Sequence, residues 1–200
     1  MNAAQRRIHD AALRLFAEKD VGKVNIRELA EAAGVARGTI YNNLESIEAL
    51  FEEIASQLSA EMDARVASSS PPDIDPALRL ANGIRYYVRR AHEEPSWGKF
   101  LLRYAISSQS LRALWAGQPL ADLMGGLQKQ RYDFQPEQLM SALSMIGGAV
   151  LTAINLVHEG HKTWRDAGSD AAEFVLRALG IGKEEARLLA QSDLPPLASP

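Results

Sequence analysis

The sequence contains no cysteine among its 200 residues, which excludes disulfide bonds, thiolate catalysis and cysteine-based metal sites. It also lacks an excess of positive charge, since 22 Lys and Arg residues stand against 25 Asp and Glu residues. Binding to nucleic acid or membrane through bulk charge is therefore excluded, and any anion-binding surface must be local. The N-terminal segment has no apolar core of the kind found in signal peptides, which predicts a cytoplasmic protein.

One long stretch, residues 138–158, has no charged side chain and is long enough to be considered as a membrane span. It contains polar and small residues, however, among them Ser141, Ser144, Thr152 and Asn155. The segments on both sides are amphipathic. We therefore expect no membrane contact and predict a helix that is buried within its own domain or against another subunit.

Apolar residues recur at spacings of three and four along almost the whole chain, whereas period-two alternation is scarce, and this predicts an all-α protein. We expect helices at about 3–19, 25–33, 37–43 and 46–67, then from 76, from 95, over 111–130 with a break at Pro119, over 136–160, over 170–179 and over 183–191. The serine- and proline-rich run at 68–73 predicts a linker. The predicted divisions are an N-terminal domain at 1–46, a connecting helix at 47–67, a larger helical domain at 68–193 and a frayed tail at 194–200.

The segment 25–50 has the pattern of a helix-turn-helix. Asn25 is expected to cap its first helix, with Glu28 completing a capping box, and Gly34 is expected to end that helix. The outer face of the second helix presents hydrogen-bonding groups with little charge of their own, which suits a DNA major groove. These groups belong to Arg37, Gly38, Thr39, Tyr41, Asn42 and Asn43.

Charge is distributed in agreement with this interpretation. Residues 1–47 contain seven Lys and Arg against six Asp and Glu, whereas residues 1–67 contain eight against eleven. The basic groups therefore lie in the first three helices. A helical hairpin with a merely solvated polar face is the alternative that the residues alone leave open.

The residues from 6 to 50 resemble the DNA-binding domain of the TetR/AcrR transcriptional regulators. The resemblance rests on Leu15-Phe16, Ile26-Arg27-x-Leu29-Ala30, Ala33-Gly34-Val35, Gly38-Thr39-Ile40-Tyr41 and Ser46-x-Glu48-x-Leu50-Phe51. It implies a three-helix DNA-binding domain joined by a fourth helix to a helical domain that binds a ligand and dimerises. Near the C-terminus, Phe174-x-Leu176-Arg177-Ala178-Leu179-Gly180 resembles many members as well.

The same resemblance implies roles for individual residues. Thr39 and Tyr41 match positions that hold phosphates or base edges, Arg27 matches a frequent phosphate contact, and Ser46 caps the fourth helix. The positions that read the DNA are matched by Arg37, Gly38, Asn42 and Asn43. Two departures are present, because Asn42-Asn43 stands where members have an aromatic pair and Ile47 where they have a lysine that contacts phosphate.

The second domain is rich in aromatic and sulfur-containing side chains, and the resemblance implies a pocket among its middle helices. We therefore predict a mostly apolar site for a small-molecule effector. Its candidate residues are Tyr87, Trp97, Phe100, Tyr104, Trp115, Met124 and Met145. Ordinary core packing is the alternative for each of them.

A two-fold homodimer is predicted through the uncharged helix and the helix that follows it. Ser144, Gly147 and Gly148 form a track of small residues along which a partner helix can approach closely. The apolar area is expected from Val150, Ile154, Val157, Phe174 and Leu179.

The predicted function is a ligand-responsive, dimeric repressor that binds double-stranded operator DNA, is not an enzyme and uses no cofactor. His158 and His161 share a helix face but lack the spacing of zinc hydrolases, so no metal site is expected. Two other classes remain open. One is a helical ligand-binding protein or enzyme with a vestigial helix-turn-helix, and the other is a protein-interaction adaptor that uses the same surface.

Overall fold

The computed structural model describes residues 2–71 and 73–199, so that Met1, Pro72 and Pro200 lie outside the described residues. Within that part of the chain all regular structure is helical, which confirms the predicted all-α fold. The elements are α1 (Ala3–Glu18), η1 (Val21–Lys23), α2 (Ile26–Ala33), α3 (Arg37–Tyr41), α4 (Ile47–Ser68), α5 (Pro76–Glu93), α6 (Pro95–Tyr104), α7 (Gln109–Ala116), α8 (Gln118–Gln128), η2 (Pro136–Gln138), α9 (Leu139–His158), α10 (Trp164–Ala178) and α11 (Lys183–Gln191).

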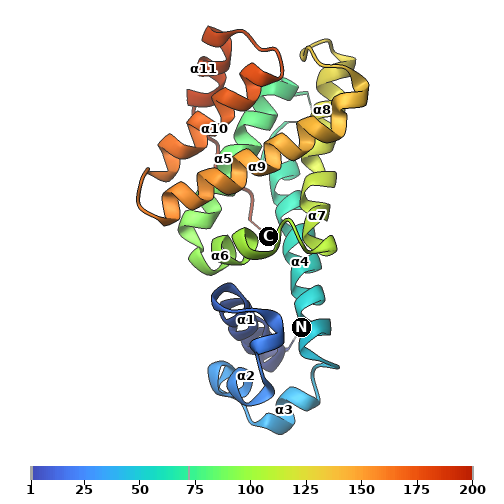
Figure 1. Cartoon of the computed structure of the whole chain (residues 1–200), viewed down its shortest axis with the longest axis vertical. Coiled ribbons are helices and arrows are strands. Elements are labelled where there is room, and N and C mark those ends of the chain that lie inside the picture. Colours follow the sequence, from blue (N-terminus) through green and yellow to red (C-terminus); the bar gives the residue numbers. More distant parts are fainter. Residues whose placement is uncertain (1, 72, 200) are drawn as a thin grey trace.

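The first three helices form a small unit at one end of an elongated molecule, and α4 runs from this unit deep into the second domain (Figure 1). Polar side chains set the beginning of each long helix in this part. Asn2 and Gln5 form a capping box on α1, and Ser46 Oγ accepts the N–H of Ala49 at 3.0 Å to begin α4.

The capping box predicted for α2 is only half formed. Asn25 Oδ1 accepts the N–H of Glu28 at 3.0 Å as expected. The Glu28 carboxylate does not bond back to Asn25, because it pairs with the Lys19 ammonium at the end of α1. An ion pair between neighbouring helices thus replaces the second bond of the box.

In the second domain α5 is the central helix and packs against α6, α8, α9, α10 and α11. The predicted helix at 111–130 is split into α7 and α8, with Pro119 in the first turn of α8, where its missing N–H costs no helical hydrogen bond. The start predicted at Asp170 is wrong. Thr163 Oγ1 accepts the N–H of Asp166 at 3.2 Å and begins α10 at Trp164, whereas Asp170 lies inside that helix and pairs with Lys162.

The two units meet at a cluster of four aromatic rings from α1, α4 and α6. Phe51 of α4 lies at the centre, with ring-centroid distances of 5.6 Å to Phe16, 5.5 Å to Phe100 and 4.9 Å to Tyr104. The Tyr104 hydroxyl donates to the carbonyl of Lys19 at 3.0 Å. The N-terminal unit is therefore packed directly onto α6 as well as joined through α4.

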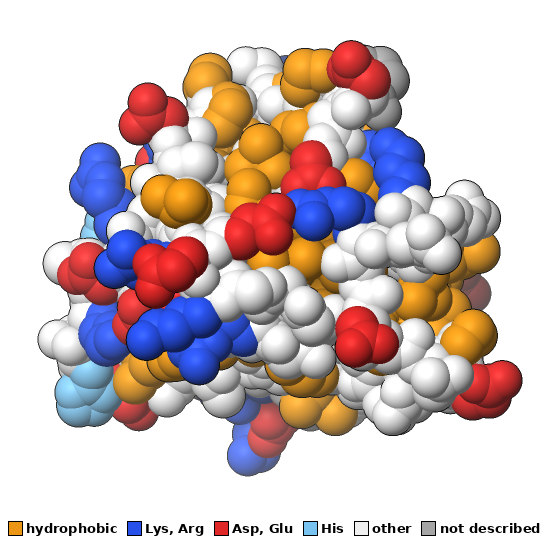
Figure 2. Space-filling model, turned by 90° about the horizontal axis from the view of Figure 1, so that it is seen from above, with side chains coloured by type: hydrophobic (Ala, Val, Ile, Leu, Met, Phe, Trp, Pro, Cys, Tyr) orange, Lys and Arg blue, Asp and Glu red, His pale blue; other side chains and the backbone are white. Residues whose placement is uncertain are grey.

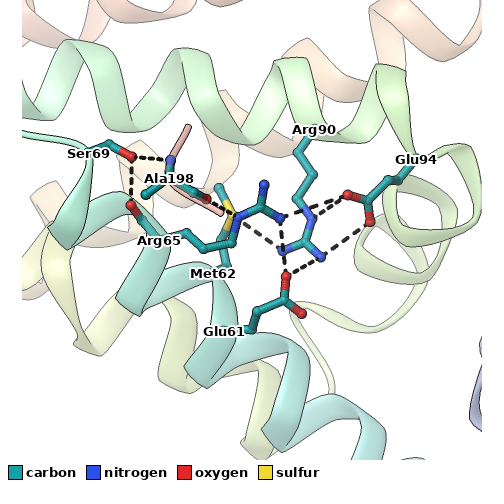
Figure 3. A network of polar contacts seen from close by, with 7 residues as sticks. All are labelled: Glu61, Met62, Arg65, Ser69, Arg90, Glu94 and Ala198. Atoms are coloured by element: carbon teal, nitrogen blue, oxygen red, sulfur yellow. Dashed lines mark hydrogen bonds and ion pairs between the residues drawn. The ribbon is translucent and has the colours of Figure 1, made fainter. Parts of the chain in front are cut away.

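A buried arginine fastens α4 to the second domain (Figure 3). The Arg90 side chain of α5 is 4% exposed, lies 4.8 Å from the Trp97 ring centroid, and places Nη2 2.9 Å from Glu61 Oε1 of α4. It also contacts both carboxylate oxygens of Glu94 at 3.2 Å. The C-terminal half of α4 is thus held by ion pairs as well as by apolar contacts.

The tail predicted to fray packs against α4 instead. Arg65 Nε donates to the carbonyl of Ala198 at 2.7 Å, and the Ala198 N–H donates to Ser69 Oγ at 2.8 Å (Figure 3). Leu194 and Leu197 are half-buried against the core. Two apolar side chains and two hydrogen bonds therefore order a segment whose local sequence has no helical or strand pattern.

Candidate DNA-binding interface and effector cavity

The helix-turn-helix is held together by a small apolar core. Leu29 and Ala33 of α2 and Ile40 of α3 are all buried. Between the helices Gly34 has φ 63°, a left-handed conformation that glycine adopts without the penalty that a Cβ brings. Because the turn is so tight, α3 is presented to solvent along its outer side.

The outer side of α3 carries most of the predicted DNA-reading residues. Arg37, Gly38, Tyr41 and Asn42 are exposed, and Tyr41 exposes 68% of its surface. Arg27 is exposed on α2, while Thr39 is half-buried. A tyrosine that is so exposed in the protein alone leaves an aromatic ring and a hydroxyl available to a partner.

Two of the predicted residues have structural partners. Asn43 Nδ2 donates to the carbonyl of Thr39 at 2.7 Å, so this amide closes the C-terminal end of α3, and its oxygen and its second N–H stay open to a base. Ser46 is half-buried and caps α4, as the resemblance implies. Ile47, which stands in the place of the phosphate-contacting lysine, is 9% exposed and belongs to the core.

The predicted effector residues separate into three groups. Tyr87 and Trp115 stack with ring centroids 5.6 Å apart and line a small cavity in the second domain. Phe100 and Tyr104 belong to the inter-domain cluster, and Trp97 lies under Arg90. Met124 and Met145 are 47% and 37% exposed at the surface, so five of the seven residues predicted for the effector site do not line this cavity.

The cavity itself has a volume of about 20 Å³, room for about one water molecule. Most of its wall is apolar, with Leu80, Ile84, Ile146 and Val150 among the lining residues. One end is polar, and this end was missed from the sequence. It is formed by Asp63 of α4 with Gln118 and Asp122 of α8.

Hydrogen bonds connect the three polar residues. Asp63 Oδ1 accepts the backbone N–H of Gln118 at 2.6 Å, and Asp122 Oδ1 accepts Gln118 Nε2 at 2.7 Å. Asp122 also pairs with Arg79 of α5. Burial raises the pKa of the Asp122 carboxyl, against the opposing effects of Gln118 and Arg79. The i, i+4 spacing of Gln118 and Asp122 places both on one helix face, but nothing in the sequence relates them to Asp63.

Some of the residues predicted for the dimer interface are exposed, and others are buried in the protomer. Ser144, Gly148 and Phe174 are exposed, and Phe174 exposes 63% of its surface. Val157 is half-buried, and Gly147 packs against the Trp115 ring of its own chain. Val150, Ile154 and Leu179 are 1%, 2% and 1% exposed, so these three fill the core of the protomer and are not available to a partner helix.

Helix α9 lies between α10 and the middle helices of the domain. Together with η2 it forms the one helical segment of the described residues, Pro136–His158, that is long and apolar enough to cross a membrane; 39% of its most apolar window is buried. His158 and His161 are exposed at its end, and His161 Nε2 lies 3.3 Å from Glu159 Oε2. Among the residues described, no group of three potential metal ligands lies together.

A short helix-turn-helix at one end, a long connecting helix and a larger helical domain define a class of DNA-binding regulators. Two family models match this chain. The model of the bacterial regulatory proteins of the tetR family matches residues 8–54, and that of the tetracyclin repressor-like C-terminal domain matches residues 75–192. The chain belongs to the TetR family.

Individual relatives agree with this assignment. The HTH-type transcriptional regulator MT1294 of Mycobacterium tuberculosis is 31% identical over 93 residues, 46% of this chain and 46% of the relative. AcrR of Shigella flexneri is 44% identical over 50 residues, 25% of this chain and 23% of AcrR. The chain therefore matches about half or less of the length of these curated relatives.

Among solved structures, RolR in complex with resorcinol is similar over 98% of this chain and 96% of RolR, with 27% identity and a TM-score of 0.74. RolR without ligand has a TM-score of 0.73. The predicted family and fold class are confirmed, and the matching family model is one of bacterial regulatory proteins.

Proposed function

We propose that this chain is a cytoplasmic homodimeric repressor that reads operator DNA with α3 and leaves it when a small hydroxylated aromatic compound occupies the cavity of the second domain. The observation that carries the effector part is the cavity itself, with its stacked Tyr87 and Trp115 at the wall and carboxylate acceptors at one end. Aromatic walls fit a flat ring, and carboxylates fit hydroxyl donors.

The similarity to RolR supports this effector class, because resorcinol is a benzene ring with two hydroxyl groups and RolR is 27% identical. Titration of the wild-type protein with resorcinol and with toluene, followed by tryptophan fluorescence, tests it. Trp115 lines the cavity, so saturable quenching by resorcinol is expected. Equal affinity for toluene, which has no hydroxyl group, would contradict the role given to the carboxylates.

The DNA-reading end is supported by the exposure of its polar side chains. Figure 2 looks at the opposite end of the molecule, where acidic, basic and apolar side chains are interspersed. At the other end α3 presents Arg37, Tyr41 and Asn42 to solvent. Amide and guanidinium groups on one short helix suit direct contact with base edges, and the tyrosine hydroxyl suits a phosphate.

We expect Asn42→Ala to weaken binding to DNA fragments selected by the wild-type protein by about 1–3 kcal/mol, with a smaller effect on random DNA. Tyr41→Phe should weaken binding to both kinds of DNA alike, since a phosphate contact carries no sequence information. Gel-shift titrations measure both effects, with Gln128→Ala on the exposed side of α8 as the control. Unchanged affinity in both α3 variants would exclude this reading surface.

The dimer interface is proposed on the exposed side of α9, together with Phe174 of α10. Met145, Gly148 and Leu156 expose apolar or small surface there. The hydroxyls of Ser144 and Thr152 donate at 2.8 Å to the carbonyls of Met140 and Gly148, one turn earlier in the same helix. They therefore need no water when a second helix covers them.

Gly148→Glu is expected to convert the dimer to a monomer at micromolar concentration. A Cβ at Gly148 meets nothing within 4 Å in the protomer, so the fold of the single chain tolerates it, whereas a carboxylate would be buried in the interface. Gly125→Glu is the matched control, because a Cβ there also meets nothing within 4 Å but the residue lies on α8. Light scattering measures the mass, and a Gly148→Glu variant that remains dimeric would contradict this interface.

A further inference from the structure

We propose that Asp63 is the residue through which an occupied effector cavity acts on the DNA-binding unit, by exchanging its hydrogen bond with α8 for one with a hydroxyl group of the effector. This inference rests on the proposed function and adds to it a named contact on the connecting helix. It concerns a positioning residue, because Asp63 acts on the DNA through α4.

The contact links the two helices directly. Helix α8 begins after Gly117, which has no side chain to cap it, and the carboxylate of Asp63 supplies the missing acceptor from α4. A carboxylate at the N-terminal end of a helix is stabilised both by the free N–H groups and by the helix dipole. A single hydrogen bond at 2.6 Å therefore closes α4 onto α8.

Gly117 is required for this close approach. A Cβ at position 117 would lie 2.2 Å from Asp63 Oδ1 and 2.6 Å from its Cγ. Any larger residue at 117 must therefore push the carboxylate away from α8. A substitution at Gly117 can therefore break the hydrogen bond between Asp63 and α8 without removing the Asp63 carboxylate.

The same carboxylate lies at the polar end of the cavity. Of the cavity's lining residues only Asp63 and Val66 belong to α4, and Val66 offers no hydrogen bond. Asp122 at the same end already has Arg79 and the Gln118 side chain as partners. Asp63, which accepts a backbone N–H, is the group of the connecting helix that an effector hydroxyl can recruit.

The size of the cavity requires a movement. An apolar cavity of roughly 150 Å³ accommodates benzene, whereas this one has a volume of about 20 Å³. A ring-sized effector must therefore separate the walls, and its hydroxyl group can replace the Gln118 N–H as they part. Ile47, where α4 enters the DNA-binding unit, lies 16 residues before Asp63, or about 24 Å along the helix axis, so a small tilt at Asp63 is enlarged at α3.

The test compares coupling in three full-length proteins. Coupling is defined as the ratio of the operator Kd at saturating resorcinol to the operator Kd without resorcinol. The DNA is a fragment selected by the wild-type protein. For the wild type we expect a ratio of at least about 5. Asp63→Asn keeps an oxygen acceptor for the Gln118 N–H but loses the charge that favours exchange, and its ratio should fall to within twofold of 1 while resorcinol still quenches fluorescence.

Asp122→Asn is the matched control, because it alters the same end of the cavity on α8 rather than on α4. It should weaken resorcinol binding yet keep the wild-type ratio at saturation. Loss of stability alone would change both operator Kd values and leave their ratio unaltered. A ratio for Asp63→Asn equal to that of the wild type overturns the proposal.

Gly117→Ala tests the same contact without any ligand. By forcing Asp63 away from α8 it should raise the operator Kd of the ligand-free protein by at least about 5-fold, toward the effector-bound value. If resorcinol neither binds the wild-type protein nor releases it from the operator, the effector class proposed above is wrong. The Gly117→Ala variant still decides the role of Asp63, because this measurement uses no ligand. An operator Kd for Gly117→Ala equal to that of the wild type overturns the inference.

Discussion

Replacing Gly126 with alanine is expected to lower the free energy of unfolding by about 2–3 kcal/mol, although alanine favours helices over glycine. The cause is a steric conflict between α8 and Tyr132, which lies in the segment that follows this helix. A Cβ at position 126 would lie 1.9 Å from Cε2 and 2.2 Å from Cδ2 of Tyr132. The Tyr132 ring is buried at 7% exposure and cannot turn away without displacing its neighbours.

The adjacent glycine is a matched control for this experiment. A Cβ at Gly125 meets nothing within 4 Å, so Gly125→Ala should raise the free energy of unfolding by about 0.5–1 kcal/mol through helix propensity alone. Thermal or denaturant unfolding measures both variants. Adding Tyr132→Val to Gly126→Ala should recover part of the loss, and equal stability of the two alanine variants would contradict the packing seen here.

Replacing Arg90 with methionine is expected to lower the free energy of unfolding by about 2–4 kcal/mol. Methionine keeps much of the aliphatic volume but removes a charge that is 4% exposed and contacts Glu61 and Glu94. Glu61 loses a partner at 2.9 Å and keeps Arg65 at 3.2 Å. The attraction of the guanidinium for the Trp97 ring is lost too.

Arg89→Met provides the comparison. Arg89 is the next residue on α5, pairs with Glu93 at 2.8 Å and lies 5.4 Å from the Trp164 ring, but its side chain is 32% exposed. A loss below about 1 kcal/mol is expected there, because water screens the pair. A double-mutant cycle of Arg90→Met with Glu61→Met isolates the contact between α5 and α4, and equal losses at Arg89 and Arg90 would exclude a special role for the buried network.

Local sequence predicted most of the DNA-binding unit correctly. The cap at Asn25, the left-handed Gly34 and the cap at Ser46 all depend on contacts within a few residues. Such contacts leave patterns that can be read directly from the chain. The capping box was predicted wrongly at Glu28, because the carboxylate of this residue pairs with Lys19, which follows another helix.

The effector site could not be predicted in the same way. Aromatic residues at helical spacing indicated a buried face, but not whether that face would meet α4, α1 or a cavity. Phe100 and Tyr104 met Phe51 at the boundary between the domains, whereas Tyr87 and Trp115 met each other beside the cavity. Which surface each aromatic side chain meets depends on the angles at which α5, α6 and α7 cross. Hydrophobic periodicity does not encode these angles.

By itself, the sequence determined an all-helical chain with an N-terminal helix-turn-helix, a connecting helix and most of the α3 residues that face outward, because periodicity, caps and turn glycines act locally. Only the tertiary structure decided that Val150 and Leu179 fill the protomer core, that the tail binds α4, and that Asp63 caps α8. These contacts join residues far apart in the chain, and the partner of each is chosen by packing rather than by any pattern around it.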